Sequence, residues 1–172
     1  MQIPLVMTVI GPDRTGLVES VAQLVAQHDG NWLESRMCRL GGEFAGILRV
    51  HLPAERRAAL EQALVKLPGL TIVVRSDETA PPAAAPQLAA LEVVGQDRPG
   101  IVREITRALA AQNVNVEELA TECVSAPMSG ELLFSARAKL LLPGGLTVSA
   151  LRQSLESAVT GLTVEVTLGE LK

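Results

Sequence analysis

Short apolar runs and amphipathic helical stripes follow one another along this chain in a regular order. Residues 5–10 are almost wholly apolar, which is typical of a central strand that is covered on at least one face. Apolar residues spaced by three or four then predict a helix. The stripe of that helix holds Leu17, Val21, Leu24, Val25 and His28.

Two alternating segments follow, at about 32–40 and 43–52, and Gly41-Gly42 between them indicates a turn. In the second segment Phe44 and Leu48 share a face, whereas Arg49 and His51 take the other. A second amphipathic helix carrying Leu60, Leu64 and Leu67 comes next, and a strand at residues 70–75 closes the series. The predicted order is therefore β-α-β-β-α-β.

The same order then occurs again, because the sequence is an internal duplication. Residues 11–18 recur at 95–102, and eight of the 24 positions in 11–34 are identical at an offset of 84. Residues 69–71 return at 161–163, an offset of 92, so the second copy has gained eight residues. Most of that gain falls around residues 126–130, which resemble a hairpin turn.

This order, found twice, predicts an α+β protein with two ferredoxin-like βαββαβ domains. Each has an antiparallel four-stranded sheet with two helices on one face. We expect domain 1 at residues 1–75, a Pro/Ala-rich linker at 76–87 and domain 2 at 88–172. The bare sheet face, or a sheet edge, then needs a partner, so we expect the two repeats to pack against each other.

The composition argues against several classes of function. The chain has 172 residues, a formal net charge of -4 and a pI near 5.2, and no basic run exceeds Arg56-Arg57. With only three aromatic residues and no basic stripe, neither stacking on bases nor direct phosphate binding is expected. No apolar stretch approaches a membrane span, and the first residues lack the positive region of a signal peptide. Two cysteines without an export signal favour a reduced cytoplasmic protein.

Catalytic and metal chemistry is not expected. His28 lies on an apolar stripe near a helix end, which favours packing or capping, and His51 is expected to face solvent. Cys38 and Cys123 lie in corresponding strands but one position out of step, so alternation places their sulfurs on opposite faces unless a bulge intervenes. Neither the usual zinc spacings nor a nucleotide-binding or nucleophile motif occurs. No catalytic residue, metal or cofactor is predicted.

What remains is the repeated strand-to-helix turn, residues 13–16 and 97–100. Gly16 or Gly100 would let a small ligand approach the N–H groups of the helix start, which can hold a carboxylate. Asn31 or Asn115 offers an amide to the charged ends of an amino acid. A purely structural interpretation is equally open: Asp13 and Asp97 cap the helices, Pro99 fits a first helical turn, and the asparagines end the helices in the left-handed region.

The Asp-Arg-Thr-Gly-Leu-Val and Asp-Arg-Pro-Gly-Ile-Val turns, followed about fifteen residues later by an asparagine, resemble the ACT domain, a small regulatory βαββαβ module. Two such modules covering nearly the whole chain, without a catalytic domain, most resemble the glycine cleavage system transcriptional repressor group. That resemblance implies an amino-acid effector bound at an interface between two modules through the strand-to-helix loop. The residues implicated are Asp13, Arg14, Thr15, Gly16, Leu17 and Asn31, with Asp97, Arg98, Pro99, Gly100, Ile101 and Asn115.

The resemblance also implies a mechanism, in which a small amino acid such as glycine alters contact with a DNA-binding activator protein. The two copies differ, since Thr15 stands where the second copy has Pro99, and Trp32 beside Asn31 is expected to narrow one pocket. Two alternatives stay open: a ligand-independent protein-binding adaptor, and a detached regulatory module of a metabolic enzyme. The pattern also allows a homodimer or a higher oligomer.

Overall fold

The structure is a computed structural model that describes residues 1–77, 87–125 and 130–169. The chain divides into two compact units, Met1–Ala80 and Pro81–Lys172, which are called domain 1 and domain 2 below. Of the predicted linker 76–87, residues 78–86 lie outside the described residues, whereas Ser76 ends one strand and Gln87 begins the next. The predicted turn at 126–130 is likewise outside them, except for Gly130.

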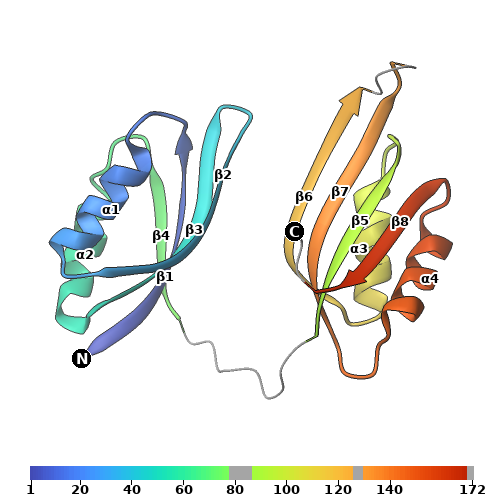
Figure 1. The fold of residues 1–172 in the computed structure, drawn as a ribbon. Coiled ribbons are helices and arrows are strands. Elements are labelled where there is room, and N and C mark those ends of the chain that lie inside the picture. Colours follow the sequence, from blue (N-terminus) through green and yellow to red (C-terminus); the bar gives the residue numbers. More distant parts are fainter. Residues whose placement is uncertain (78–86, 126–129, 170–172) are drawn as a thin grey trace. The chain divides into compact units, whose positions relative to one another are not determined.

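Domain 1 contains the predicted elements in the predicted order. They are β1 (Gln2–Pro12), α1 (Leu17–Gln27), β2 (Asn31–Leu40), β3 (Glu43–Pro53), a 3-10 turn η1 (Ala54–Arg56), α2 (Arg57–Leu64) and β4 (Thr71–Ser76). The strands form one antiparallel sheet in the order β2-β3-β1-β4, and α1 and α2 cover one of its faces (Figure 1). This arrangement confirms a ferredoxin-like fold.

Strand alternation explains where the core of domain 1 lies. Leu5, Met7 and Val9 of β1 stand beside Val50 and Leu48 of β3 on the same face of the sheet. All five side chains lie in the core, against the buried residues of α1 and α2. β1 begins earlier than the apolar run suggests, because pairing with β3 extends from Gln2 to Pro12.

Domain 2 repeats this architecture. Its elements are β5 (Gln87–Gln96), α3 (Ile101–Ala111), β6 (Asn115–Ser125), β7 (Leu132–Leu142), α4 (Val148–Ala158) and β8 (Leu162–Leu168). The sheet order is β6-β7-β5-β8, and α3 and α4 lie on one face (Figure 1). A separate core forms between them, so each domain has its own hydrophobic interior.

The described helices include none that is both long enough and apolar enough to cross a membrane.

Candidate functional site

The two strand-to-helix turns have the same backbone. β1 ends at Pro12 and α1 begins at Leu17, and the residue that caps the helix is Gly16, with φ 83°. Gly100 takes the same place before α3, with φ 91°. Both values lie in the left-handed region, which favours glycine. The expectations that Asp13 and Asp97 cap the helices and that Pro99 lies within the first helical turn are therefore wrong.

Both turns have open space beside the glycine. A Cβ atom placed on Gly16 or on Gly100 would have no atom of the described chain within 4 Å. No side chain caps the N-terminus of α1 or α3, whereas Thr147 Oγ1 accepts a hydrogen bond from Ala150 N at 3.2 Å at the start of α4. The first N–H groups of a helix have no partner inside the helix, and no side chain caps them at these two turns.

The turn of domain 1 carries Arg14 and Arg39 beside Asp13, and Glu19 lies in the first turn of α1. Asp13 N donates to Gly42 O at 2.9 Å, which ties the turn to the β2–β3 hairpin. The Asp13 carboxylate is neutralised by Arg39, whose Nε lies 2.6 Å from Oδ2. Arg14 donates only a long hydrogen bond, 3.5 Å from Nη2 to Pro68 O, and no carboxylate of the described residues pairs with it. The guanidinium of Arg14 therefore lies at the turn with no carboxylate partner among the described residues.

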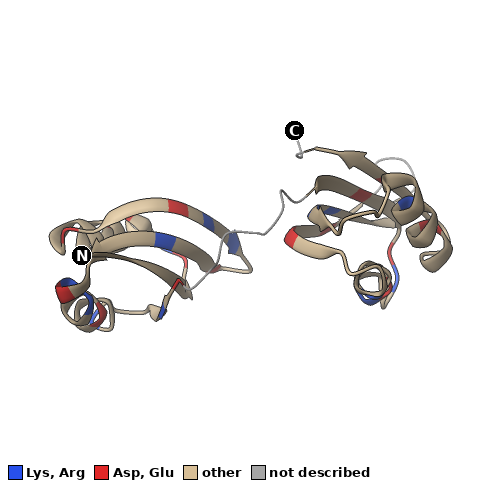
Figure 2. Ribbon diagram, turned by 90° about the horizontal axis from the view of Figure 1, so that it is seen from below, with Lys and Arg blue, Asp and Glu red and all other residues tan. Residues whose placement is uncertain are grey.

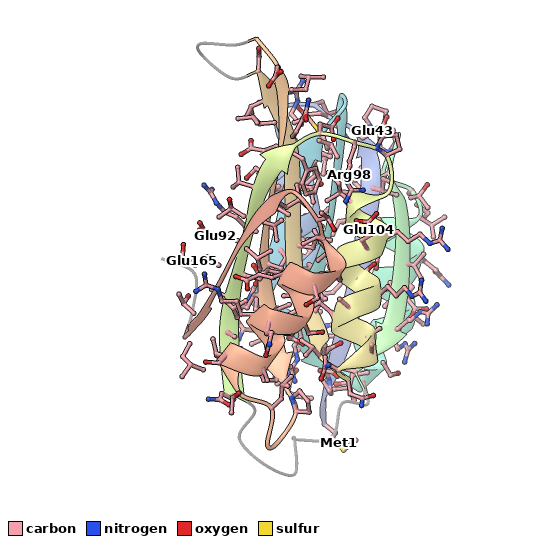
Figure 3. All side chains as sticks on the ribbon, turned by 90° about the vertical axis from the view of Figure 1, so that its right-hand side faces the viewer. Met1, Glu43, Glu92, Arg98, Glu104 and Glu165 are labelled. Atoms are coloured by element: carbon pink, nitrogen blue, oxygen red, sulfur yellow. The ribbon has the colours of Figure 1, made fainter. Side chains whose placement is uncertain are left out.

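In domain 2 the equivalent arginine is already occupied (Figure 3). Arg98 donates two hydrogen bonds to the Glu104 carboxylate, Nη1 to Oε1 at 2.8 Å and Nη2 to Oε2 at 2.5 Å. These bonds raise the pKa of Arg98 and lower the pKa of Glu104, because each charged group stabilises the charged form of its partner. The equivalent of Glu104 in domain 1 is Ser20, whose hydroxyl bonds instead to Gly16 O at 2.8 Å.

A second replacement removes a positive charge beside the aspartate of domain 2. Arg39 stands opposite Phe44 in the β2–β3 ladder, and Cys123 stands opposite the equivalent Phe134. Asp97 therefore meets a thiol where Asp13 meets a guanidinium. Desolvation raises the pKa of Cys123, and the charge of Asp97 and its hydrogen bond with the thiol raise it further.

The two turns consequently differ in which charged side chains meet. Domain 1 brings two arginines and one aspartate together, whereas domain 2 brings together one arginine, one aspartate and one glutamate. Sequence reasoning missed Arg39 and Glu104. The signal was present, because the offset of 84 aligns Arg39 with Cys123 and Ser20 with Glu104.

Asn31 and Asn115 lie far from the turn of their own domain. Asn31 stands opposite His51, which pairs with Pro4 near the start of β1, whereas the turn follows Pro12 at the end of that strand. Eight residues of strand correspond to about 26 Å. One small ligand cannot contact both within a domain.

The asparagines also do not end the helices as the structural interpretation predicts. Each is the first residue of a strand, and the residues in the left-handed region are Asp29 and Asn113, with φ 59° and 54°. Asn115 Nδ2 donates to Glu117 Oε1 at 2.6 Å. Trp32 pairs with Val50 and packs against the core, on the face opposite to Asn31. The expectation that Trp32 narrows a pocket at Asn31 is therefore wrong.

His28 and the two cysteines have the expected positions, whereas His51, which was expected to face solvent, is half-buried in β3. His28 is half-buried at the end of α1, and its Nδ1 lies 2.8 Å from Leu24 O, which agrees with packing and capping. Cys38 stands opposite Ala45 and Cys123 opposite Phe134, so the two sulfurs do lie on opposite faces of their sheets. Both thiols are free and exposed. Among the described residues, no cluster of His, Cys, Asp or Glu side chains could hold a metal ion.

Comparison with known proteins gives a consistent result. Two family profiles described as ACT domain match residues 4–72 and 89–136, which together make up more than half of the chain. The glycine cleavage system transcriptional repressor of Escherichia coli (strain K12) is 26% identical over 166 residues, covering 94% of this chain and 85% of the repressor.

Solved structures agree on the fold. A crystal structure of a protein of unknown function from Galdieria sulphuraria is 32% identical, with a TM-score of 0.82, and covers 99% of this chain and 100% of that one. A crystal structure of a candidate glycine cleavage system transcriptional repressor is 18% identical, with a TM-score of 0.69 and coverage of 98% and 99%. With its doubled βαββαβ fold and two matched profiles, the chain belongs to the ACT domain family and carries two ACT domains in tandem.

Proposed function

We propose that this protein is a non-enzymatic regulator that binds a small amino acid, glycine or one similar to it, and modulates transcription through a protein partner. A regulatory role is supported by the two ACT domains and by the similarity to a glycine cleavage repressor. The single observation that carries the amino-acid proposal is the open turn of domain 1, with Arg14 unpaired by any carboxylate of the described residues.

The chemistry of that turn suits a carboxylate. A guanidinium fork binds a carboxylate with two parallel hydrogen bonds, and a helix N-terminus favours the same charge. Arg14 and the N–H groups at Gly16 and Leu17 would supply these interactions, and the exposed Thr15 borders the same opening. The ammonium group of the ligand would lie beside a carboxylate or an amide oxygen.

The other residues of the proposed site have supporting roles. In domain 2 the turn formed by Asp97, Arg98, Pro99, Gly100 and Ile101 is equally open, but its arginine is held by Glu104. We therefore propose that domain 1 is the stronger site for a carboxylate. Asn31 or Asn115 would contact the ligand only from a second ACT domain, since each lies at the far end of its own sheet.

We further propose that the partner is a DNA-binding activator protein. This follows the similarity to the Escherichia coli repressor and the net charge of -4, which does not favour direct binding to nucleic acid. For glycine to change that contact, it must bind two arrangements of the protein with different affinities. The two exposed free thiols agree with a reducing compartment such as the cytoplasm.

Calorimetric titration of the full chain with glycine, serine and other small amino acids tests the ligand. Replacement of Arg14 by glutamine should weaken binding by about 10- to 100-fold, the effect of losing a charged hydrogen-bonded pair. Arg98→Gln is the matched control and should bind nearly as tightly as the wild type. Absence of binding to every amino acid at millimolar concentration would contradict the sensor proposal. Equal losses in both variants would contradict the preference for domain 1.

A pull-down of DNA-binding proteins, with and without the amino acid, separates the sensor from a ligand-independent adaptor. We expect the amount of captured activator to change with the ligand in the wild type and to be constant in Arg14→Gln. Identical capture under both conditions in the wild type would favour the adaptor.

A further inference from the structure

Each sheet has two edge strands, whose outer backbone groups pair with no other described strand. These are β2 and β4 in domain 1 and β6 and β8 in domain 2. A β-bulge interrupts β2 after Trp32 and β6 after Val116. Such bulges twist an edge away from further pairing. β4 and β8 pair with their inner neighbours without any shift, so they are the two regular edges.

The edge β4 has the composition of a strand that pairs on both sides. Residues 72–74 are β-branched and aliphatic, and Arg75 is the one charged residue of the strand. Charged residues mark several other strands of both sheets (Figure 2), and charge is a usual protection of an edge. Ile72 and Val74 pack against the core of domain 1, whereas Val73 is 47% exposed. The middle of this edge is therefore unprotected.

In domain 2 the equivalent edge carries a charge at its middle. Val73 of β4 stands opposite Thr8, and the equivalent pair in domain 2 is Glu165 of β8 opposite Glu92 of β5. Both glutamates lie on the side of the sheet away from α3 and α4 (Figure 3). If two β8 strands paired around Glu165, like charges would stand opposite each other, which is destabilising. Two β4 strands have no such conflict.

The hydrogen bonds of β4 determine which of its backbone groups are free. Asp77 N, just beyond the strand, donates to Pro4 O at 3.1 Å, so this residue directs its backbone groups toward β1. Every second residue of an antiparallel strand points the same way, which places Val73 with Asp77. The N–H and C=O groups of Ile72 and Val74 therefore point outward, to the free edge.

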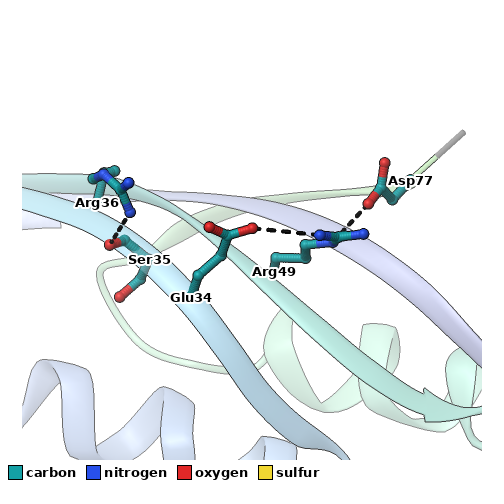
Figure 4. Close-up of polar contacts among 5 residues, drawn as sticks. All are labelled: Glu34, Ser35, Arg36, Arg49 and Asp77. Carbon is teal, nitrogen blue, oxygen red and sulfur yellow. Dashed lines mark hydrogen bonds and ion pairs between the residues drawn. The ribbon is translucent and has the colours of Figure 1, made fainter. Parts of the chain in front are cut away.

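Side chains hold the end of β4 from both faces of the sheet. Arg57 Nη1 of α2 donates to Ser76 Oγ at 2.8 Å. On the other face, Arg49 Nε lies 2.7 Å from Asp77 Oδ2 (Figure 4). In domain 2 the place of Asp77 is taken by Gly169, which has no side chain to form such a pair. The edge of domain 1 is thus fixed to its end, and an edge that is already ordered loses less entropy when it pairs.

We propose that β4 pairs antiparallel with β4 of a second copy of this chain, so that two domain 1 sheets become one continuous sheet. A twofold axis at Val73 puts the two Val73 side chains opposite each other as a non-hydrogen-bonded pair. Ile72 then stands opposite Val74 of the second copy, and the outward groups of both exchange hydrogen bonds. Arg75 stands opposite Thr71, so no like charges meet. This proposal does not depend on the amino-acid site.

Disulfide trapping tests the register. In a full chain with the free thiols Cys38 and Cys123 replaced by serine, Val73→Cys should form an interchain disulfide under mild oxidation, because side chains of a non-hydrogen-bonded pair are close enough. Thr71→Cys is the matched control on the same face of the same strand. Its two copies would lie about 13 Å apart, so it should cross-link at least about tenfold more slowly. Equal rates for the two variants would overturn the proposal.

A charge at the middle of β4 tests the pairing itself. Sedimentation of the native full chain should show a dimer that forms as concentration rises. Val73→Glu should raise the Kd by about tenfold or more, whereas the uncharged, β-branched Val73→Thr should change it little. The glutamate variant should fold, as circular dichroism can check, because domain 2 holds Glu165 at the equivalent place. A chain that is monomeric at every concentration would overturn the proposal, as would a dimer that Val73→Glu leaves intact.

Discussion

Arg14 and Arg98 occupy the same place in two copies of one turn, and their partners give them different roles. The guanidinium of Arg98 is held by Glu104, whereas that of Arg14 has only a 3.5 Å contact with Pro68 O. An arginine that is already paired with a carboxylate of its own domain must lose that partner before it can bind the carboxylate of a ligand. A single difference, Ser20 against Glu104, thus separates an accessible site from an occupied one.

The Arg98–Glu104 pair gives a pH dependence with a definite sign. Its hydrogen bonds lower the pKa of Glu104, so the stabilisation is present above the ordinary carboxyl range and is lost as the pH falls through the lowered pKa. Glu104→Gln should therefore lower the thermal midpoint of domain 2 at neutral pH. The difference from the wild type should shrink in a series of melting curves as the pH falls below the ordinary carboxyl range and through the lowered pKa. A difference that stays the same across the whole acid range in which the domain is folded would contradict this assignment.

Gly100→Val tests the geometry of the turn. No steric clash is expected, because a Cβ at this position meets no described atom within 4 Å. The cost arises from φ 91° and should be about 1–2 kcal/mol in unfolding by denaturant, with Gly16→Val similar. Gly100→Asn, which tolerates the left-handed region better, should lose less. Equal losses for valine and asparagine would count against backbone strain as the cause.

At the scale of elements, much of the fold could be predicted from periodicity and repetition. The alternation of Phe44, Leu48 and Val50 with Arg49 identified the buried face of β3, and the stripe of α1 identified its buried side. The contacts of Asp13 with Arg39 and of Asp97 with Cys123 could be predicted only from the exact strand register. In each domain a β-bulge, after Trp32 or after Val116, shifts that register by one residue. Sequence pattern alone does not fix such a bulge.

Because each domain has its own core, a core substitution should destabilise only the domain that contains it. Leu151 is fully buried in α4 and packs in the core of domain 2. Leu151→Ala should cost about 2–5 kcal/mol in that domain. Hydrogen exchange should show faster amide exchange in β5, β7 and β8 and unchanged protection in β1 and β3. Leu60→Ala, in the core of domain 1, is the matched control and should reverse the pattern.

For the whole molecule, duplication produced two domains with the same backbone and different charges. At the strand-to-helix turn, Arg98 of domain 2 is paired with Glu104, whereas Arg14 of domain 1 pairs with no carboxylate of the described residues. Composition could not predict this division, since the net charge of -4 averages over both domains. The difference between the domains follows from the strand registers, which identify the equivalent residues of the two copies.

The measurement that tests the amino-acid site most directly is a titration of the ¹⁵N-labelled full chain with glycine, followed by amide chemical shifts. Saturable shifts should centre on Thr15, Gly16 and Leu17, with smaller changes at Gly100 and Ile101, and Arg14→Gln should abolish the first set. If those amides keep their positions at millimolar glycine and serine while the spectrum is otherwise that of the folded protein, the turn of domain 1 is not an amino-acid site.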